Sequence, residues 1–283
     1  ERAKALFEEG IRRFSNKDFS GAEQSFRAAN GLAPGRVSIL SNLATSLFKQ
    51  DRFDEAREWA LQALDADADD FEAILCLGGC CEKAGQWEEG LAHYRQALAL
   101  RPGAAEALSN IGIMLTHLKR HAEALDSFDQ AIAASPQFPD AWINRGKTLN
   151  DMGRCEEALA NHERALQLQP RSVEAWYNRG NALTNLGRRA EAVQSYDKAL
   201  ALAPQHADAH FNKSLALLDG CKFAEGWKEY EWRWKSPTSG ATPLPTLLPQ
   251  WDGSATSRRL LLWAEQGVGD EIFYASMLPQ LHA

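Results

Sequence analysis

The chain has 283 residues, of which 45% are hydrophobic and 24% are charged, and its formal net charge is −7 from 38 acidic and 31 basic side chains. This composition is ordinary for a folded protein. The acidic balance argues against a nucleic-acid partner, because phosphate binding needs a basic surface. No apolar run approaches the length of about 18 residues that a membrane-spanning helix needs, so we expect no such helix.

The start of the chain and its cysteines bear on targeting and on redox state. The first residues, Glu1 to Lys4, do not form the apolar core of a signal peptide. The five cysteines are odd in number and fall within helical patterns. They therefore predict free thiols in a reducing, cytoplasmic compartment.

From the N-terminus onward the chain repeats itself with a fixed period. Prolines recur 34 residues apart, or twice that distance where Ala68 replaces a proline. They are Pro34, Pro102, Pro136, Pro170 and Pro204. A period of 34 predicts a tandem array of helix–turn–helix units, and each proline is expected to end the second helix of its unit. Pro139 is expected to open a first helical turn instead.

Small residues recur in phase with the prolines when repeats are counted from Ala3, Val37, Phe71, Ala105, Pro139, Val173 and Ala207. Position 8 of the seven repeats is Gly10, Ala44, Gly78, Gly112, Gly146, Gly180 and Ser214. Position 20 is Ala22, Ala56, Gly90, Ala124, Ala158, Ala192 and Gly226. Glycine inside a helix costs about 1 kcal/mol relative to alanine, so we expect a close helix–helix approach in return, with position 8 against the small residues of the second helix.

Large side chains at position 24 are expected to fill the gaps between these close contacts. They include Phe26, Tyr94, Phe128 and Tyr196, whereas Ala60 and His162 depart from the aromatic pattern. The turn glycine at position 15 is also replaced in four repeats, by Lys17, Asp51, Lys119 and Cys221. These departures put single turns in doubt.

These residues resemble the tetratricopeptide repeat family over residues 3 to about 235. The resemblance implies an all-α, right-handed superhelix of paired helices whose first helices line a concave surface. The predicted array spans residues 1–235, with repeats near 3–36, 37–70, 71–104, 105–138, 139–172, 173–206 and 207–235. Since one hairpin cannot bury its apolar face alone, stability is expected to come from stacked neighbours.

The pattern changes after the array. Residues 236–257 contain four prolines and predict an extended linker. Residues 258–283 then begin with a short apolar run that suits a buried strand. Gly267, Gly269 and Asp270 follow, and a helical pattern begins after them. Strand, glycine turn and helix are typical of the opening of an α/β nucleotide-binding unit.

This C-terminal segment resembles the start of the glycosyltransferase-like domain behind many bacterial tetratricopeptide arrays, and it is similar to the amino-terminal end of heptosyltransferases, which have the GT-B fold. The resemblance implies a catalytic base at Asp270 and a phosphate- or nucleotide-binding turn at Gly267 and Gly269, with the rest of the enzyme beyond Ala283. The alternative is a tight turn that starts a helix, with Asp270 as its cap.

The candidate binding residues lie on the first helices. Position 6 is asparagine in five repeats, at Asn42, Asn110, Asn144, Asn178 and Asn212. An amide side chain both donates and accepts hydrogen bonds, so a row of them could hold a peptide backbone, and it resembles the asparagine ladder in the array of O-linked N-acetylglucosamine transferase. The alternative is that these amides brace neighbouring repeats. Asn181, Tyr177 and Phe211 are expected beside the row, the two aromatics as anchors for a partner or as ordinary packing.

Other recurring groups have simpler explanations. Position 2 is acidic at Glu72, Glu106, Asp140, Glu174 and Asp208, which suits the helix dipole or, alternatively, an acidic lip for a basic partner. Cys76, Cys80 and Cys81 have no second cysteine or histidine pair at a familiar ligand spacing, so buried free thiols are expected and neither a metal nor a cofactor is predicted.

The predicted function is a protein–protein interaction scaffold that receives a partner peptide or helix. The rival is the substrate-recruiting arm of a glycosyltransferase, in which case these 283 residues are not an active enzyme by themselves. A third possibility is self-association through an aromatic cap at Trp227, Trp232 and Trp234.

Overall fold

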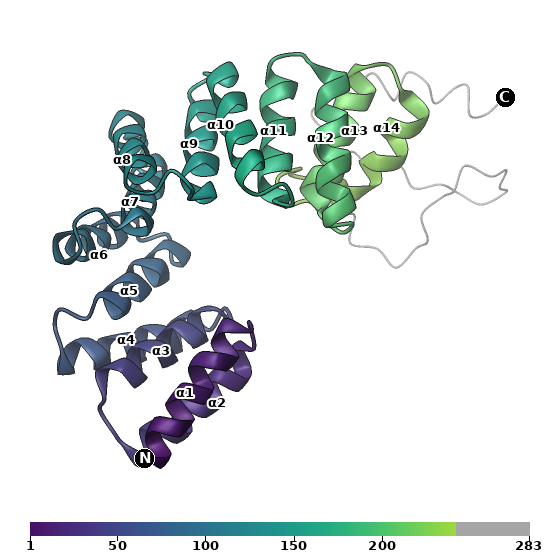
Figure 1. Cartoon of the computed structure of the whole chain (residues 1–283). Helices are drawn as coiled ribbons and strands as arrows, with labels where there is room; N and C mark the ends of the chain where they lie inside the picture. Colours follow the sequence, from purple (N-terminus) through teal and green to yellow (C-terminus); the bar gives the residue numbers. More distant parts are fainter. Residues whose placement is uncertain (242–283) are drawn as a thin grey trace, which may run out of the picture. The chain divides into compact units, whose positions relative to one another are not determined.

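The computed structural model describes residues 1–241, and within them every regular element is helical. Pairs of helices joined by short turns follow one another along the chain (Figure 1). The pairs are α1 (Arg2–Ser15) with α2 (Phe19–Leu32), α3 (Val37–Phe48) with α4 (Phe53–Ala66), α5 (Phe71–Lys83) with α6 (Trp87–Leu100), α7 (Ala105–His117) with α8 (His121–Ala134), α9 (Pro139–Asp151) with α10 (Cys155–Leu168), α11 (Val173–Asn185) with α12 (Arg189–Leu202), and α13 (Ala207–Asp219) with α14 (Phe223–Tyr230), which the 3-10 helix η1 (Glu231–Trp234) follows.

The chain forms two compact units, Glu1–Ala182 and Leu183–Ala283, and the boundary falls inside α11. The predicted all-α solenoid class is confirmed for the described residues of both units. None of the helices in residues 1–241 is long and apolar enough to cross a membrane. The predicted strand, Gly267, Gly269, Asp270 and most of the predicted linker lie outside the described residues.

In four hairpins the glycine at position 8 packs against the ring at position 24 of the second helix. A Cβ atom added to Gly112 would lie 2.5 Å from the Phe128 ring, and one added to Gly10 would lie 2.5 Å from the Phe26 ring. The glycine therefore receives the position-24 ring of its own second helix, a contact that the sequence analysis did not assign to it. A ring that packs directly on the glycine backbone fills the space left by the missing side chain.

Position 20 supplies the second close contact. Ala22, Ala124 and Ala158 are fully buried, and a Cβ atom on Gly90 would lie 3.4 Å from the carbonyl oxygen of Gly78. The prediction that positions 8 and 20 lie between helices is confirmed. Where position 24 is Ala60, position 8 is Ala44, and both are fully buried; the methyl group of Ala44 occupies space that a ring would otherwise need.

The turns that lack glycine at position 15 have the same backbone conformation as the turns that contain it. Position 15 has a φ of about +71 to +74° at Gly85, Gly153 and Gly187. The four non-glycine residues there adopt φ values between 59 and 62°. The turns therefore do not change where Lys17, Asp51, Lys119 and Cys221 replace glycine, although the left-handed conformation costs an L-residue about 1–2 kcal/mol.

The aromatic end of the second unit packs onto α13. The Trp232 ring stacks on His210 with centroids 4.0 Å apart, and the Arg233 guanidinium lies 4.1 Å from the Trp234 ring centroid. Lys213 holds this corner through Nζ contacts of 2.9 Å with Asp197 and 2.9 Å with Glu229. Trp227, by contrast, is 48% exposed.

Candidate protein-binding surface

The position-6 asparagines of the first unit lie away from the helix that closes each hairpin. Positions 6 and 8 are about 200° apart around a helix, so the glycine contact turns the asparagine outward. Asn110 on α7 and Asn144 on α9 are half-buried, and their side-chain amides have no hydrogen-bond partner within the described residues. α7 and α9 contact each other, so the two amides come from adjacent first helices.

The other members of the row have different environments. Asn42 is half-buried, and its Nδ2 donates to the Ser38 carbonyl oxygen at 2.7 Å within the same helix. Asn178 is only 8% exposed, whereas Tyr177 and Asn181 are half-buried on α11. The bracing alternative is not seen at Asn110 or Asn144, because neither amide bonds to a neighbouring helix.

The row is interrupted on α5, where Cys76 occupies position 6. Cys76 is 7% exposed, and a hydrogen bond with Cys80 together with burial raises the pKa of its thiol. A buried neutral thiol cannot replace an amide as a strong donor and acceptor. The amides of the first unit therefore fall into two groups, on either side of α5.

The second unit contains Phe211 and Asn212 on α13, both half-buried. The Phe211 ring lies 5.8 Å from the Tyr230 ring of α14. Phe211 therefore contributes to packing within its unit, which is the simpler of the two roles considered for it.

Carboxylates at position 2 share the first helices with the asparagines. Glu106 and Asp140 have large solvent-exposed areas, but neighbouring atoms partly shield their carboxyl groups from water, and this loss of solvation raises the pKa of both side chains. Repulsion from Glu72 raises the pKa of Glu106 further, and repulsion from Glu174 does the same for Asp140. Stabilisation by the helix dipole would lower these pKa values, so removal of water and like-charge repulsion outweigh it at both residues.

Lys49 is a basic residue of this surface that sequence reasoning missed. It follows α3, and its charge lowers the pKa of Glu106, of Asp140 and of Cys76. Its positive charge therefore acts on side chains of three first helices, α5, α7 and α9, that lie far apart in the sequence. Nothing in the local sequence marks it, because its effect on residues of later hairpins depends on how the hairpins stack.

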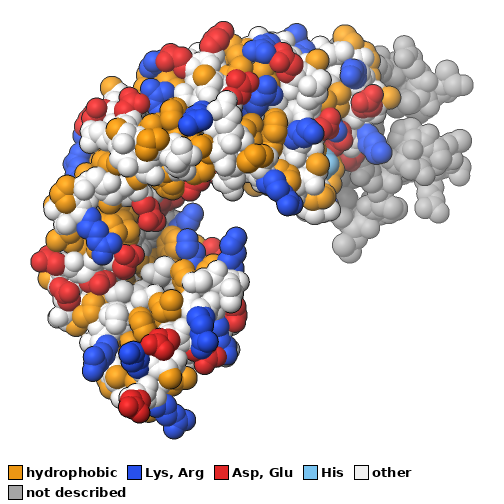
Figure 2. Space-filling view, viewed as in Figure 1, with side chains coloured by type: hydrophobic (Ala, Val, Ile, Leu, Met, Phe, Trp, Pro, Cys, Tyr) orange, Lys and Arg blue, Asp and Glu red, His pale blue; other side chains and the backbone are white. Residues whose placement is uncertain are grey.

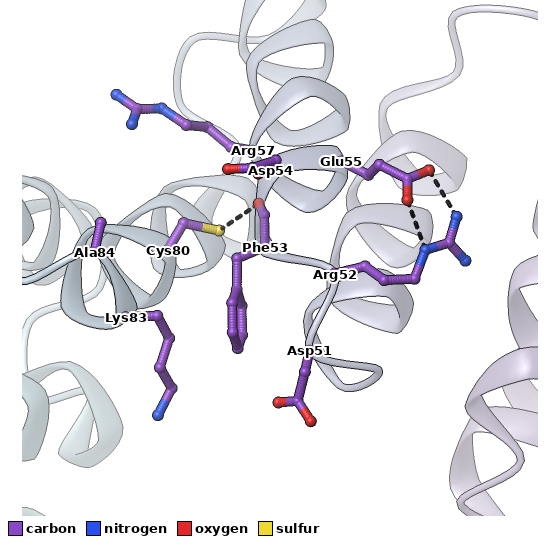
Figure 3. A pocket seen from close by; sticks show the side chains of 9 residues that line it. All are labelled: Asp51, Arg52, Phe53, Asp54, Glu55, Arg57, Cys80, Lys83 and Ala84. Carbon is purple, nitrogen blue, oxygen red and sulfur yellow. Dashed lines mark hydrogen bonds and ion pairs between the residues drawn. The ribbon is translucent and has the colours of Figure 1, made fainter. Parts of the chain in front are cut away.

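A pocket of about 410 Å³ lies at the α3–α4 turn and the end of α5 (Figure 3). Arg52 forms a two-pronged ion pair with Glu55 at 2.6 Å on each arm, and the Cys80 Sγ donates to the Phe53 carbonyl oxygen at 3.5 Å. Arg57 reaches Glu89 at 3.0 Å. These side chains hold neighbouring elements together. Most residues that line the pocket are charged.

The visible face of the described residues carries charges of both signs among hydrophobic side chains (Figure 2). No part of that face is covered by one charge alone. Selectivity on such a surface comes from local groups such as the amides and carboxylates described above, rather than from a long-range field.

One group of side chains in the first unit has metal-ligand chemistry. Cys81, Glu89 and His93 place one ligand atom each within 4.8 Å of the others. Burial raises the pKa of the Cys81 thiol to about 11, and burial lowers the pKa of His93. No metal was predicted here, because the three residues follow no familiar spacing.

Models of protein families match most of the described chain. A tetratricopeptide repeat model matches residues 82–139, 143–207 and 183–226, and a second tetratricopeptide repeat model matches residues 13–75. Among curated proteins, Protein FlbA of Caulobacter vibrioides is 36% identical over 61 residues, which are 21% of this chain and 10% of FlbA. The match thus spans about a tenth of that protein.

Solved structures share the fold at low sequence identity. The APC/C hetero-tetramer Cut9–Hcn1 has a TM-score of 0.72 and 16% identity, over 76% of this chain and 43% of that one. A tetratricopeptide repeat protein from Parabacteroides merdae has a TM-score of 0.63 and 19% identity, over 81% and 91% of the two chains. At such identities the similarity shows the fold alone.

Proposed function

Because the chain belongs to the tetratricopeptide repeat family, we propose that its first unit is a scaffold that binds an extended segment of a partner protein along the first helices of its hairpins. The observation that carries this proposal is the pair of half-buried amides at Asn110 and Asn144, which have no partner within the described residues. A partly buried amide that makes no internal hydrogen bond gains most from a ligand that completes its bonding.

A peptide backbone has the complementary chemistry. Each residue of an extended strand presents one N–H and one C=O group, and each asparagine amide can meet both kinds of group. Binding of this type depends little on the partner's side chains, so the amides set affinity and the flanking groups set selectivity.

The carboxylates favour a partner segment that carries lysine or arginine. Glu106 and Asp140 repel neighbouring carboxylates, and burial further disfavours their ionised forms. A cation from the partner would relieve both effects, and such pairs weaken as salt is added. The five free cysteines, four of them buried, suit the reducing cytoplasmic location predicted from the sequence.

The test compares partner recovery by the full chain and by variants. Asn110→Ala with Asn144→Ala should reduce recovery of the partner at least about tenfold, since two charge-free hydrogen-bonding sites are lost at about 1 kcal/mol or more each. Gln130→Ala with Gln167→Ala is the matched control, because these amides lie on second helices. Equal recovery by the asparagine variant and wild type would remove the amide row as the binding site.

The glycosyltransferase-arm alternative rests on residues 258–283, which lie outside the described residues. It predicts that a longer parent protein continues with alternating strands and helices and loses transfer activity in Asp270→Asn. A parent that retains full activity in that variant would exclude Asp270 as the base.

Self-association through the aromatic cap has one favourable observation, the exposure of Trp227. Trp232 and Trp234 already contact His210 and Arg233 within their own unit. Light scattering over a range of concentrations tests the idea, and a monomer throughout would exclude it.

A further inference from the structure

The α5–α6 hairpin departs from the other repeats at four positions that lie close together in space. Position 11 is leucine in five repeats, at Leu47, Leu115, Leu149, Leu183 and Leu217, but here it is Cys81. Position 16 is arginine in four repeats, at Arg52, Arg120, Arg154 and Arg188, but here it is Gln86. Position 20 is alanine in five repeats but Gly90 here, and position 23 is His93, the one histidine at that position in the seven repeats.

The change from arginine to Gln86 at position 16 leaves the Glu89 carboxylate without the ion pair that four other hairpins form at the start of their own second helix. In four hairpins the arginine at position 16 holds the glutamate at position 19, as in Arg120–Glu123 at 2.6 Å and Arg154–Glu157 at 2.7 Å. Gln86 has no charge and cannot do this for Glu89. The ion pair of Glu89 comes instead from Arg57 of the preceding hairpin, through one carboxylate oxygen at 3.0 Å.

The other three changes bring ligand atoms toward that carboxylate. Glu89 and His93 are four residues apart on α6, so their side chains lie on one face of the helix. Cys81 faces them from α5, and it is 1% exposed. A Cβ atom on Gly90 would lie 3.0 Å from the Met114 sulfur and 3.4 Å from the Cys81 Cβ, so an alanine at this position would crowd the thiol.

We propose that Cys81, Glu89 and His93 form a binding site for Zn²⁺ or a divalent metal ion of similar ligand preference, with water as the fourth ligand. The three ligand atoms lie within 4.8 Å of one another. Tetrahedral zinc with bonds of about 2.0–2.3 Å places its ligand atoms about 3.5 Å apart, so small side-chain rotations close the site.

The donor set selects the metal. A thiolate sulfur and an imidazole nitrogen suit zinc and cobalt, whereas calcium and magnesium prefer oxygen ligands throughout. On binding, the Cys81 thiol releases its proton to solvent, and the thiolate and the Glu89 carboxylate together balance the two positive charges of the ion. Arg57 pairs with one carboxylate oxygen of Glu89, which leaves the other oxygen for the metal and orients Glu89 toward the site.

The experiment titrates the reduced full chain with Co²⁺, which reports thiolate ligation as near-ultraviolet charge-transfer absorption, and then displaces it with Zn²⁺. We expect one tight site per chain, and a Zn²⁺-dependent rise in the melting temperature, because the ion binds the folded state. Cys81→Ser should abolish the charge-transfer absorption. Glu89→Gln and His93→Gln should weaken binding by at least about tenfold.

Two further variants keep the outcome interpretable. Gln86→Arg restores the arginine of the other repeats and leaves all three ligands in place; it should weaken Co²⁺ binding several-fold while the metal-free protein stays folded. Cys221→Ser removes the exposed cysteine and should leave the titration unchanged. The proposal is overturned if wild type gives no thiolate absorption, or if that absorption survives in Cys81→Ser or disappears in Cys221→Ser.

Discussion

Two adjacent hairpins of the first unit, α7–α8 and α9–α10, close in the same way with different chemistry. A Cβ atom on Gly112 would lie 2.5 Å from the Phe128 ring, and a Cβ atom on Gly146 would lie 2.5 Å from the His162 ring. Both rings are fully buried. Neither ring nitrogen of His162 has a hydrogen-bond partner, and burial lowers the pKa of His162 to about 3.

The comparison teaches that shape decides this position and that polarity is secondary. A flat ring of either kind fills the space above the glycine. An unsatisfied buried polar group costs about 1–3 kcal/mol, so the α9–α10 hairpin accepts an energetic penalty that its neighbour avoids. Stacked neighbours can absorb that penalty in a repeat protein.

The largest change in stability is expected when the glycine beneath each ring is replaced. Gly112→Ala and Gly146→Ala should each lower the free energy of unfolding by about 3 kcal/mol, because the new methyl group overlaps a ring that has no room to move. Urea unfolding followed by circular dichroism measures the change. Gly31→Ala in α2 is the matched control: a Cβ atom there meets nothing within 4 Å, so it should stabilise by up to about 1 kcal/mol. Equal effects at the three sites would contradict the ring-on-glycine contact.

The next largest change in stability is expected when the buried imidazole of the α9–α10 hairpin is replaced by the phenyl ring found in α7–α8. His162→Phe should raise the free energy of unfolding at pH 7 by about 1–3 kcal/mol, since it removes two unsatisfied nitrogens and keeps the ring. Urea unfolding of both proteins under the same conditions measures the gain. A loss of stability would show that the imidazole makes contacts that a phenyl ring cannot replace.

The same substitution should change the response to acid. The folded pKa of His162 is about 3, below the unfolded value of about 6.5. The unfolded chain therefore takes up the proton first, and the stability due to neutral His162 is complete above pH 6.5 and lost as the pH falls toward 3. At pH 5 the advantage of His162→Phe should be about 2 kcal/mol larger than at pH 7. A constant difference across this window would contradict a buried, neutral His162.

The turns of the same two hairpins give a smaller effect of opposite sign. Lys119 has a φ of 61°, and Gly153 has a φ of 74° at the equivalent place. Lys119→Gly should stabilise by about 0.5–1 kcal/mol because it relieves the left-handed conformation, whereas Gly153→Ala should destabilise by about 1 kcal/mol. Thermal unfolding of the two variants beside wild type measures both, and shifts in the same direction would contradict the shared turn geometry.

The smallest effect concerns the first turns of α7 and α9. The pKa of Glu106 is raised by burial and by like charges, so its ionised form opposes folding. A raised folded pKa means that protonated Glu106 favours the folded state. This contribution to stability is complete below about pH 4.5, the ordinary pKa of the unfolded chain, and it is lost as the pH rises through the folded pKa. Glu106→Gln should therefore stabilise at pH 7 by less than about 1 kcal/mol, because the group is exposed.

This gain should shrink below pH 4 and as salt is added. Urea unfolding at several pH values and salt concentrations measures it, with Glu88→Gln in the first turn of α6 as the control. A gain of equal size in the control would assign the effect to net charge alone.

Sequence reasoning predicted the fold class but not the ring that packs on each position-8 glycine, and the amide row as a binding site stays a prediction. The phase of Gly112 and Asn110 on one helix places them on opposite faces, and this follows from helical geometry without coordinates. The ring beneath Gly112 could not be distinguished from the small residues near it, because both lie on the same second helix. The left-handed φ of Lys119 was missed because the residue type argues against it.

The sequence alone determined what depends on a regular period: paired helices, the turns that end them, and the face that each recurring residue occupies, since 34 residues return every side chain to an equivalent place. Only the tertiary structure decided which residues from different hairpins meet. The effect of Lys49 on Glu106 and the group of Cys81, Glu89 and His93 depend on how helices pack on one another, and short-range sequence patterns contain no record of that packing.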